Sequence, residues 1–418
     1  MPVPLATHPR RYLWMLFGVT GGALVAIAAL NVLADPFRVF ATPIHAGLND
    51  RAPDTSGFDR MAKPYELLRV LPRMVLFGSS TARVGFNSLA DWDTPLPKPA
   101  YNYALLGASA HEVRLSLAQA LRECPVETVV MVADFFAFNA HYLDNERFAP
   151  ARLQAATRRG LPGFLGSDLA AFAIGREALG LSWQTFLTSR RAKGSAGIVG
   201  PWWPDYPWHV HFRNCERSYL AKWFPPPSHA YEFASPETGR DRLADFDASL
   251  RLCAGRGIRL IVLCPPIHAR FQEAISAAGA WPQYEVWKRE LAIRTRAQQA
   301  QPSGSVELWD FSLFNDLTCE PLPADGMGPM RYFSDSAHFT PEFGHLVLDE
   351  IGDPSPSRPT RLGVRLDQVE IEAHLGGVRS ALEVFRAANP GVVADVHAAL
   401  GIADARVTAP RASATSRR

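Results

Sequence analysis

Two short segments, far apart in the sequence, contain the residue types that nucleophilic catalysis by serine requires. Ser79 and Ser80 follow a short apolar run, and Asp335 and His338 stand three residues apart, just before a Thr-Pro-Glu sequence typical of a helix start. A serine hydroxyl becomes a nucleophile when an imidazole takes its proton, and a carboxylate can hold that imidazole in the right tautomer. Ser80, His338 and Asp335 are therefore our candidate catalytic residues. Taken alone, each segment is equally explained by ordinary helix capping.

The segments between these motifs alternate between short apolar runs and amphipathic stretches. The expected strands are residues 74–77, 101–106, 126–136, 258–264 and 306–311. Their apolar residues are continuous rather than alternating, as in strands covered on both faces of a parallel sheet. Apolar residues three or four apart predict helices at 110–123 and 242–254, and a further helix runs from the Thr-Pro-Glu sequence to about residue 351. The order predicts an α/β domain with a doubly wound, mostly parallel sheet and its site at the carboxyl edge.

Three segments do not follow this alternation. Residues 36–70 are mixed in character and we interpret them as a stalk. Within the α/β domain, which we place at 71–352, residues from about 140 to 240 are dense in Trp and Pro and predict an insertion that caps the carboxyl edge. Residues 353–418 begin like a linker, continue with helical patterns near 366–376 and 379–399, and end in a tail that we expect to be disordered.

The N-terminus predicts a membrane anchor. Residues 12–33 contain no charged side chain over 22 positions. A helix of that length spans about 33 Å, enough for a bilayer core of about 30 Å. Arg10 and Arg11 precede the run, so the positive-inside rule places residues 1–35 as an anchor with its N-terminus in the cytoplasm and the rest of the chain across the membrane. A cleaved signal peptide and a buried soluble helix are the alternatives.

The two candidate segments and a third motif together resemble the SGNH (GDSL-like) hydrolase superfamily. In that superfamily a GDS motif after the first strand carries the nucleophile, and a DxxH motif before the last helix carries the other triad members. Ser80 matches the nucleophile, and Ser79 stands in place of the family's aspartate. Asp335 and His338 match the second motif. An N-x-x-x-x-G block ends at Gly107, so the resemblance implies an oxyanion hole formed by the backbone N–H groups of Ser80 and Gly107.

The superfamily's Asn block, which supplies another oxyanion donor, is not matched. Residues 133–139, at the end of the third expected strand, contain no GxND motif, and Asn139 is the candidate substitute although it is displaced along the chain. The loss of one such donor reduces the rate by about 10²–10³-fold in a known case. The missing Asn block therefore puts the efficiency of an ordinary esterase in doubt.

Three further residues are candidates for substrate binding. Ser79 adjoins the nucleophile, Arg83 lies one turn beyond it and could meet an anionic group, and His111 opens the helix after Gly107. A turn-supporting role for Ser79 and solvated helix positions for the other two are the plain alternatives. We expect no bound metal and no cofactor.

The resemblance extends to a membrane-anchored branch that includes the teichoic-acid D-alanyl transfer protein and the alginate O-acetylation proteins. It covers about residues 31–350, and it implies a periplasmic domain, on an inner-membrane anchor, that O-acylates (in particular O-acetylates) an envelope polysaccharide through an acylated Ser80. A membrane-bound O-acyltransferase is the implied partner. An esterase of the same fold and a catalytically silent scaffold are the alternatives.

The amino-acid composition argues against several other classes of protein. Lys and Arg number 43 against 41 acidic residues, a balance that gives no reason to expect nucleic acid as a partner. Hydrophobic residues make up 47% and charged residues 20%, which excludes a disordered chain. Five cysteines without a CxxC pair in 418 residues are no disulfide scaffold.

Overall fold

The chain folds into two compact units. The computed structural model describes residues 9–87, 89, 92–158, 164–191, 204, 206–301, 304–323, 326–353 and 362–402. One unit comprises Met1–Leu71 with Arg147–Ile198, and the other comprises Pro72–Glu146 with Val199–Arg418. This division differs from the predicted boundaries, because residues 36–70 belong to the first unit and the predicted 140–240 insertion is shared between the two.

The second unit contains a six-stranded sheet. Its strands are β1 (Met74–Phe77), β2 (Ala100–Asn102), β3 (Thr128–Val132), β6 (Arg259–Cys264), β7 (Val306–Asp310) and β8 (Val364–Arg365). They lie in the order β2-β1-β3-β6-β7-β8, and all neighbours are parallel except β7 and β8. A separate antiparallel pair joins β4 (Ala234–Ser235) and β5 (Arg240–Asp241). The mixed α/β class and the mostly parallel sheet are therefore confirmed.

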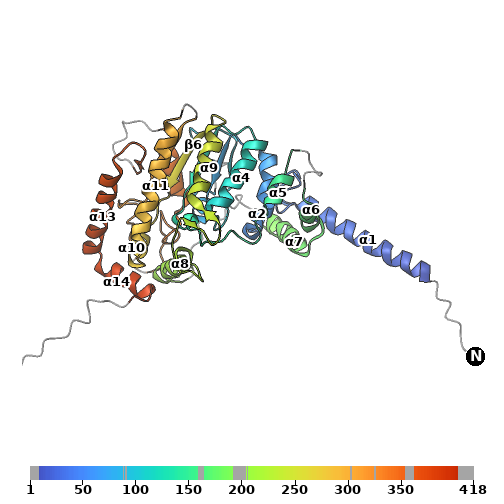
Figure 1. Cartoon of the computed structure of the whole chain (residues 1–418). Helices are drawn as coiled ribbons and strands as arrows, with labels where there is room; N and C mark the ends of the chain where they lie inside the picture. The colour runs from blue at the N-terminus through green and yellow to red at the C-terminus, as the bar shows by residue number, and fades with distance from the viewer. Residues whose placement is uncertain are drawn as a thin grey trace, which may run out of the picture. The chain divides into compact units, whose positions relative to one another are not determined.

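Helices cover both faces of this sheet. On one face α4 (Ala110–Glu123), α9 (Arg242–Ala254) and α11 (Trp281–Gln299) lie side by side (Figure 1). On the other face α12 (Pro341–Gly352) packs into a cluster that joins Phe343 and Val347 to the strand residues Leu76, Val130 and Ile261. The burial of every residue in β1 and β3 explains why their sequences are continuous apolar runs.

Several predicted boundaries change, and the strand expected over 101–106 is β2, which ends at Asn102. The strand expected over 126–136 ends at Val132, and Phe135–Phe138 form a 3-10 turn that begins after Asp134. The C-terminal helices expected at 366–376 and 379–399 are α13 (Ile371–Ala388) and α14 (Pro390–Ala399). The break falls at Pro390 because proline lacks the N–H that a continuing helix requires, and it is favoured instead in the first turn of a new one. The predicted linker and tail lie mostly outside the described residues.

The remaining helices of the second unit surround the carboxyl edge. They are α3 (Ser80–Gly85), α8 (Trp208–Trp223) and α10 (Ala269–Ala277). Helix α14 contacts both α8 and α10, and Arg217 on α8 donates a hydrogen bond of 2.7 Å to the carbonyl of Ala399. The C-terminal extension is thus packed against the helix that borders the carboxyl edge.

The first unit is helical. Its helices are α1 (Pro9–Ala34), α2 (Asp59–Val70), α5 (Pro150–Ala155), α6 (Gly166–Ile174) and α7 (Arg176–Arg191), with a 3-10 turn at Ser56–Phe58. Aromatic residues Phe37, Tyr65 and Phe172 share its apolar core, so residues 36–70 contribute to a packed unit and do not form a simple stalk.

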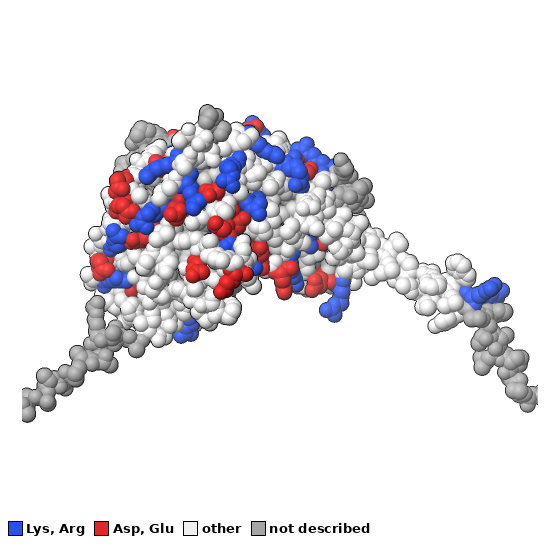
Figure 2. Space-filling view, viewed as in Figure 1, with Lys and Arg blue, Asp and Glu red and all other residues white. Residues whose placement is uncertain are grey.

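Helix α1 is long and apolar enough to cross a membrane. The qualifying stretch is Arg10–Ala34, 25 residues, and its N-terminal two thirds are exposed. In Figure 2 it is a white rod with positive charge only at its N-terminal end, whereas positive and negative side chains are interspersed over the visible face of the second unit. The last turns of α1 pack against α6 and α7 of the same unit.

Candidate active site

The turn before Ser80 has no space for a side chain at Gly78. Strand β1 ends at Phe77, Gly78 follows with φ +155°, and Ser80 begins α3. A Cβ atom added to Gly78 would lie 2.8 Å from the Cβ of Ala82 and 2.9 Å from that of Val132, so the close approach of helix and sheet requires glycine. Ser80 is consequently half-buried at the carboxyl edge, with its N–H in the first turn of a helix.

Ser80, His338 and Asp335 form one hydrogen-bonded chain although 258 residues separate the first two. His338 Nε2 lies 2.8 Å from Ser80 Oγ, and His338 Nδ1 lies 2.6 Å from Asp335 Oδ2. A carboxylate only accepts hydrogen bonds, so Nδ1 carries the proton and Nε2 is the atom that can accept one from Ser80. This is the tautomer that a general base for a serine nucleophile needs.

The Asp335 carboxylate is buried, yet it is held in its charged form. Burial alone would raise its pKa, but the His338 imidazole and the backbone N–H groups of Ala337 and His338, each 2.8 Å from Oδ1, bring the pKa below its ordinary value. The Cys215 thiol of α8 lies 3.3 Å from the same oxygen and donates to it. Asp335 therefore remains an anion beside the imidazole at neutral pH.

Close packing of α3 against α12 brings the two motifs together. A Cβ atom on Gly344 of α12 would lie 1.9 Å from the carbonyl oxygen of Gly85, the last residue of α3. A Cβ atom on Gly85 would in turn meet the Phe339 ring at 1.9 Å. The two helices can approach this closely because both positions are glycine. The contact joins α3, which begins at Ser80, to α12, which follows His338.

Two backbone N–H groups are the candidates for holding an oxyanion. Gly107 has φ +59°, and a Cβ atom there would lie 2.8 Å from the hydroxyl of Tyr142, which donates to the Gly107 carbonyl. Neither the N–H of Gly107 nor that of Ser80 donates a hydrogen bond to another described residue. Both therefore remain available for a ligand, as the candidate oxyanion hole requires.

The structure removes Asn139 from the candidate oxyanion hole. Its side-chain N–H₂ group donates to the carbonyls of Trp223 and Ala230, at 2.9 and 3.0 Å, so both amide hydrogens are used. Its side-chain oxygen accepts from the N–H of His141. Asn139 is fully buried and fastens the loop after β3 to the segment after α8, which is a structural role.

The three candidate substrate-binding residues have different positions. Ser79 is 1% exposed and donates its N–H to Asp134, so it supports the turn and does not face a substrate. Arg83 is half-buried on α3, three residues beyond Ser80. His111 Nδ1 lies 2.8 Å from Asp144 Oδ2, which places its imidazole in a polar cluster at the start of α4.

Sequence reasoning missed a buried carboxylate behind the nucleophile. Asp134, directly after β3, accepts a 2.7 Å hydrogen bond from the hydroxyl of Thr81. Burial raises its pKa, and the hydrogen bonds from Thr81 and Ser79 offset only part of that rise. The signal available in the sequence was its position at the carboxyl end of the third expected strand.

Helix α8 contributes the other residues that were missed. Cys215 and Tyr219 lie on this helix beside the triad, with the Tyr219 ring centroid 6.2 Å from that of His338. The ammonium group of Lys222 lies 3.9 Å from the centroid of the Tyr219 ring. Their sequence carries no motif, because these residues reach the site only through the packing of α8 and not through a local pattern.

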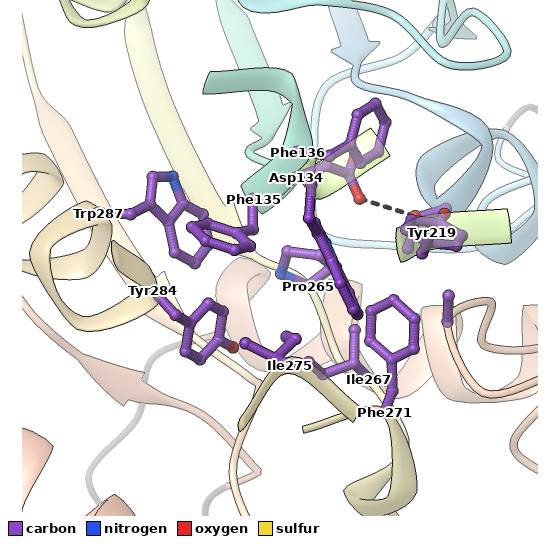
Figure 3. A pocket seen from close by; sticks show the side chains of 13 residues that line it. Asp134, Phe135, Phe136, Tyr219, Pro265, Ile267, Phe271, Ile275, Tyr284 and Trp287 are labelled. Atoms are coloured by element: carbon purple, nitrogen blue, oxygen red, sulfur yellow. Dashed lines mark hydrogen bonds between the residues drawn. The ribbon is translucent and has the colours of Figure 1, made fainter. Parts of the chain in front are cut away.

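An apolar pocket adjoins the triad. Thr81 and Ala337, the neighbours of Ser80 and His338, form one wall together with Asp134. The other walls are mainly aromatic and come from the 3-10 turn Phe135–Phe138 and from helices α8, α10 and α11 (Figure 3). They are Phe135, Phe136, Tyr219, Phe271, Tyr284 and Trp287. Such a lining suits a small apolar group.

In the described part of the chain one group of residues has the types and spacing of metal ligands. Atoms of Cys215, Asp335 and His338 lie within 4.8 Å of one another. Burial raises the pKa of the Cys215 thiol well above its usual value, and the nearby Asp335 charge raises it further. In this structure the protonated Cys215 thiol donates a hydrogen bond to the Asp335 carboxylate.

Comparison with known proteins adds no assignment. No protein-family model matches the chain, and no curated protein is significantly similar to it.

Proposed function

We propose that this protein is a membrane-anchored serine O-acyltransferase of the SGNH-like kind, with its second unit in the periplasm. Its substrate would be a hydroxyl group of a cell-envelope polysaccharide and its acyl group an acetyl. The observation that carries the proposal is the hydrogen-bonded chain from Ser80 through His338 to Asp335. Helix α1 supports the membrane location, while the acceptor and a membrane-bound O-acyltransferase as the acyl source rest on the resemblance.

The first half-reaction acylates Ser80. The Ser80 Oγ atom attacks the carbonyl carbon of the acyl donor while its proton passes to His338 Nε2. The N–H groups of Ser80 and Gly107 hold the oxyanion that forms, and Asp335 stabilises the imidazolium. The intermediate collapses as the bond to the donor's leaving oxygen breaks and that oxygen takes the proton from Nε2. The acyl group is then an ester of Ser80.

The second half-reaction reverses the roles. A sugar hydroxyl attacks the Ser80 ester and gives its proton to His338 Nε2. The second tetrahedral intermediate expels Ser80 Oγ, which recovers its proton from the imidazolium. The products are an acylated sugar and free Ser80. Water in place of the sugar would make the same site a hydrolase.

The decisive test is covalent labelling of the purified full-length protein, in detergent, by a fluorophosphonate. Such reagents phosphonylate a serine only when a base activates it. We expect labelling of the wild type and its loss in Ser80→Ala and His338→Ala, with the modified peptide containing Ser80. No labelling of the wild type would contradict the proposal and favour a silent scaffold.

Transfer and hydrolysis are then distinguished by product analysis. The protein is incubated with an activated acetyl ester, with and without an oligosaccharide acceptor. We expect acetylated oligosaccharide to form faster than free acetate when the acceptor is present. Acetate at an unchanged rate, without acetylated sugar, would make the protein an esterase.

A further inference from the structure

The phenol of Tyr219 is a buried polar group without a partner. The side chain is 3% exposed, and its hydroxyl makes no hydrogen bond to any described residue. Buried polar atoms nearly always have hydrogen-bond partners, so an exception calls for an explanation, such as a role in ligand binding or catalysis. Tyr219 lies on the wall of the pocket beside the triad (Figure 3), with its ring centroid 6.2 Å from that of His338.

Other tyrosines near the carboxyl edge are satisfied. The hydroxyl of Tyr142 donates to the Gly107 carbonyl at 3.1 Å, that of Tyr231 to the Phe135 carbonyl at 2.5 Å, and that of Tyr284 to Ser312 at 2.8 Å. Tyr219 thus differs from its neighbours in lacking an acceptor, which is expected if the acceptor is a ligand.

The surroundings of Tyr219 keep it protonated. Burial raises the pKa of Tyr219 well above its usual value, the nearby carboxylates of Asp134 and Asp335 raise it further, and the Ser80 hydroxyl offsets only part of the rise. The phenol is therefore a hydrogen-bond donor at any pH where the protein works, beside the oxygen that attacks the substrate.

A cation lies over the face of the same ring. The Lys222 ammonium group is 3.9 Å from the Tyr219 centroid and 4.8 Å from the Phe136 centroid. A cation over the face of an aromatic ring is attracted to it, so Lys222 restrains the ring in place. A positive charge at this position also favours negative charge that develops on a nearby substrate oxygen.

The two candidate backbone donors of the oxyanion hole leave room for a third hydrogen-bond donor. The candidate oxyanion hole has two backbone N–H groups, from Ser80 and Gly107, and the amide of Asn139 is used in structural hydrogen bonds. We propose that Tyr219 donates a hydrogen bond to the oxyanion formed at Ser80 and that Lys222 positions its ring. This proposal rests on the proposed acyl transfer, and it makes Tyr219 a catalytic residue and Lys222 a positioning residue.

The test compares two tyrosine variants, one at the proposed donor and one at a tyrosine with a structural hydrogen bond. Tyr219→Phe removes a hydroxyl that has no partner in the resting protein, so the melting temperature should be unchanged or higher. Tyr231→Phe leaves the Phe135 carbonyl without its donor, so the melting temperature should fall while turnover per folded molecule stays at the wild-type value. The substrate is p-nitrophenyl acetate and the protein is the full chain in detergent.

We expect Tyr219→Phe to lower kcat by about 10²–10³-fold with little change in KM, the effect of removing one oxyanion donor. Lys222→Met should lower kcat less, and the double variant should be no slower than Tyr219→Phe alone, because the two residues act as a unit.

The outcomes separate this inference from the function on which it rests. A wild-type protein that is neither labelled by fluorophosphonate nor active on the ester would overturn both. An active wild type with Tyr219→Phe at the same kcat would overturn the inference and leave the acyl-enzyme mechanism intact. A lower kcat accompanied by a lower melting temperature, as in Tyr231→Phe, would assign Tyr219 a structural role and also overturn it.

Discussion

At the scale of residues, the site depends on a row of hydrogen bonds in which each side chain orients its neighbour. Asp335 holds the His338 ring through Nδ1, and the same ring presents Nε2 to Ser80. Under the proposed mechanism, removal of one member leaves the other two in place but stops the proton transfer that they support. The chemistry therefore belongs to the chain and not to any single residue.

This dependence predicts non-additive losses. Ser80→Ala and His338→Ala should each reduce acyl transfer by at least about 10²–10⁴-fold, and the double variant should be no worse than the more severe single one. The measurement is transfer or ester hydrolysis per folded molecule. Ser79→Ala is the matched control. Because Ser79 is buried and supports the turn, this variant should lose much less activity. If Ser79→Ala is the inactive variant, the nucleophile has been misassigned by one residue.

The depressed pKa of Asp335 predicts how stability depends on pH. Its pKa is lower in the folded protein than in the unfolded chain, so its contribution is complete above about pH 4 and is lost as pH falls through the folded value. The wild type should therefore exceed Asp335→Asn in free energy of unfolding at pH 5–7, and the difference should shrink below about pH 4. Chemical denaturation across this range measures it. A constant difference would contradict the account of Asp335.

Sequence reasoning found the residues whose motifs are local. The positions of Ser80, Asp335 and His338 followed from a strand-to-helix turn and a loop before a helix, and the structure brings the three together. Asn139 was wrong because its role depends on the carbonyls of Trp223 and Ala230, which lie 84 and 91 residues away. Tyr219 and Lys222 gave no signal, since only the packing of α8 brings them to the site.

At the scale of elements, the site is set by the contact of α3 with α12. Hydrophobic periodicity and caps predicted the helices themselves, and the expected 110–123 and 242–254 match α4 and α9. The contact could not be predicted, because it depends on two glycines that meet across 259 residues. Capping-box hydrogen bonds at Ser109 and Glu112 are local and therefore visible in sequence, whereas helix–helix fit is not.

The contact predicts an effect of one methyl group. Gly344→Ala would place a Cβ atom 1.9 Å from the Gly85 carbonyl oxygen, so α12 must move away from α3. We expect a loss of about 1–3 kcal/mol in stability and a larger proportional loss of activity, because the distance between Ser80 and His338 grows.

The matched control is Gly377→Ala on α13, where an added Cβ meets nothing within 4 Å. Alanine is the better helix former, so this variant should gain up to about 1 kcal/mol of stability and keep its activity. Thermal denaturation and ester turnover compare the two variants. Equal behaviour of both would show that the contact between α3 and α12 does not set the site.

At the scale of the whole molecule, the chain combines a membrane-length helix with an α/β unit that has a serine triad. The C-terminal extension, expected to lie apart, packs through α14 against α8, which borders the site. Both features make sense if the protein must act at a fixed location on a substrate that is itself part of the envelope.

The orientation of α1 gives a topology prediction. Arg10 and Arg11 stand at its N-terminal end, so the positive-inside rule places residues beyond 35 on the periplasmic side. A phosphatase reporter fused after residue 60 should be active, and a reporter that works only in the cytoplasm should be inactive. Replacing both arginines with Glu should weaken or reverse this orientation. The opposite result for the unmodified anchor would exclude a periplasmic function.

The final prediction is that α1 stays attached to the mature protein. The alternative, a cleaved signal peptide, would remove the last turns of a helix that is built into the first unit. The Asn31 side chain is fully buried, its Nδ2 donates to the Ala173 carbonyl at 2.9 Å, and its Oδ1 accepts from the Ser182 hydroxyl at 2.8 Å. Cleavage after Ala34 would leave both partners on α6 and α7 without their hydrogen bonds, at a cost of about 1–3 kcal/mol for each buried group.

Mass spectrometry of the protein purified from membranes tests this directly. We expect peptides that begin before residue 12, and we expect the protein to remain in the membrane fraction after alkaline carbonate washing. Asn31→Ala should stay anchored, since the apolar length of α1 is unchanged, but should lower the melting temperature. Val384→Ala, an exposed substitution in the other unit, is the control and should leave the melting temperature nearly unchanged. A mature N-terminus after Ala28, Ala29 or Ala34 would overturn the anchor.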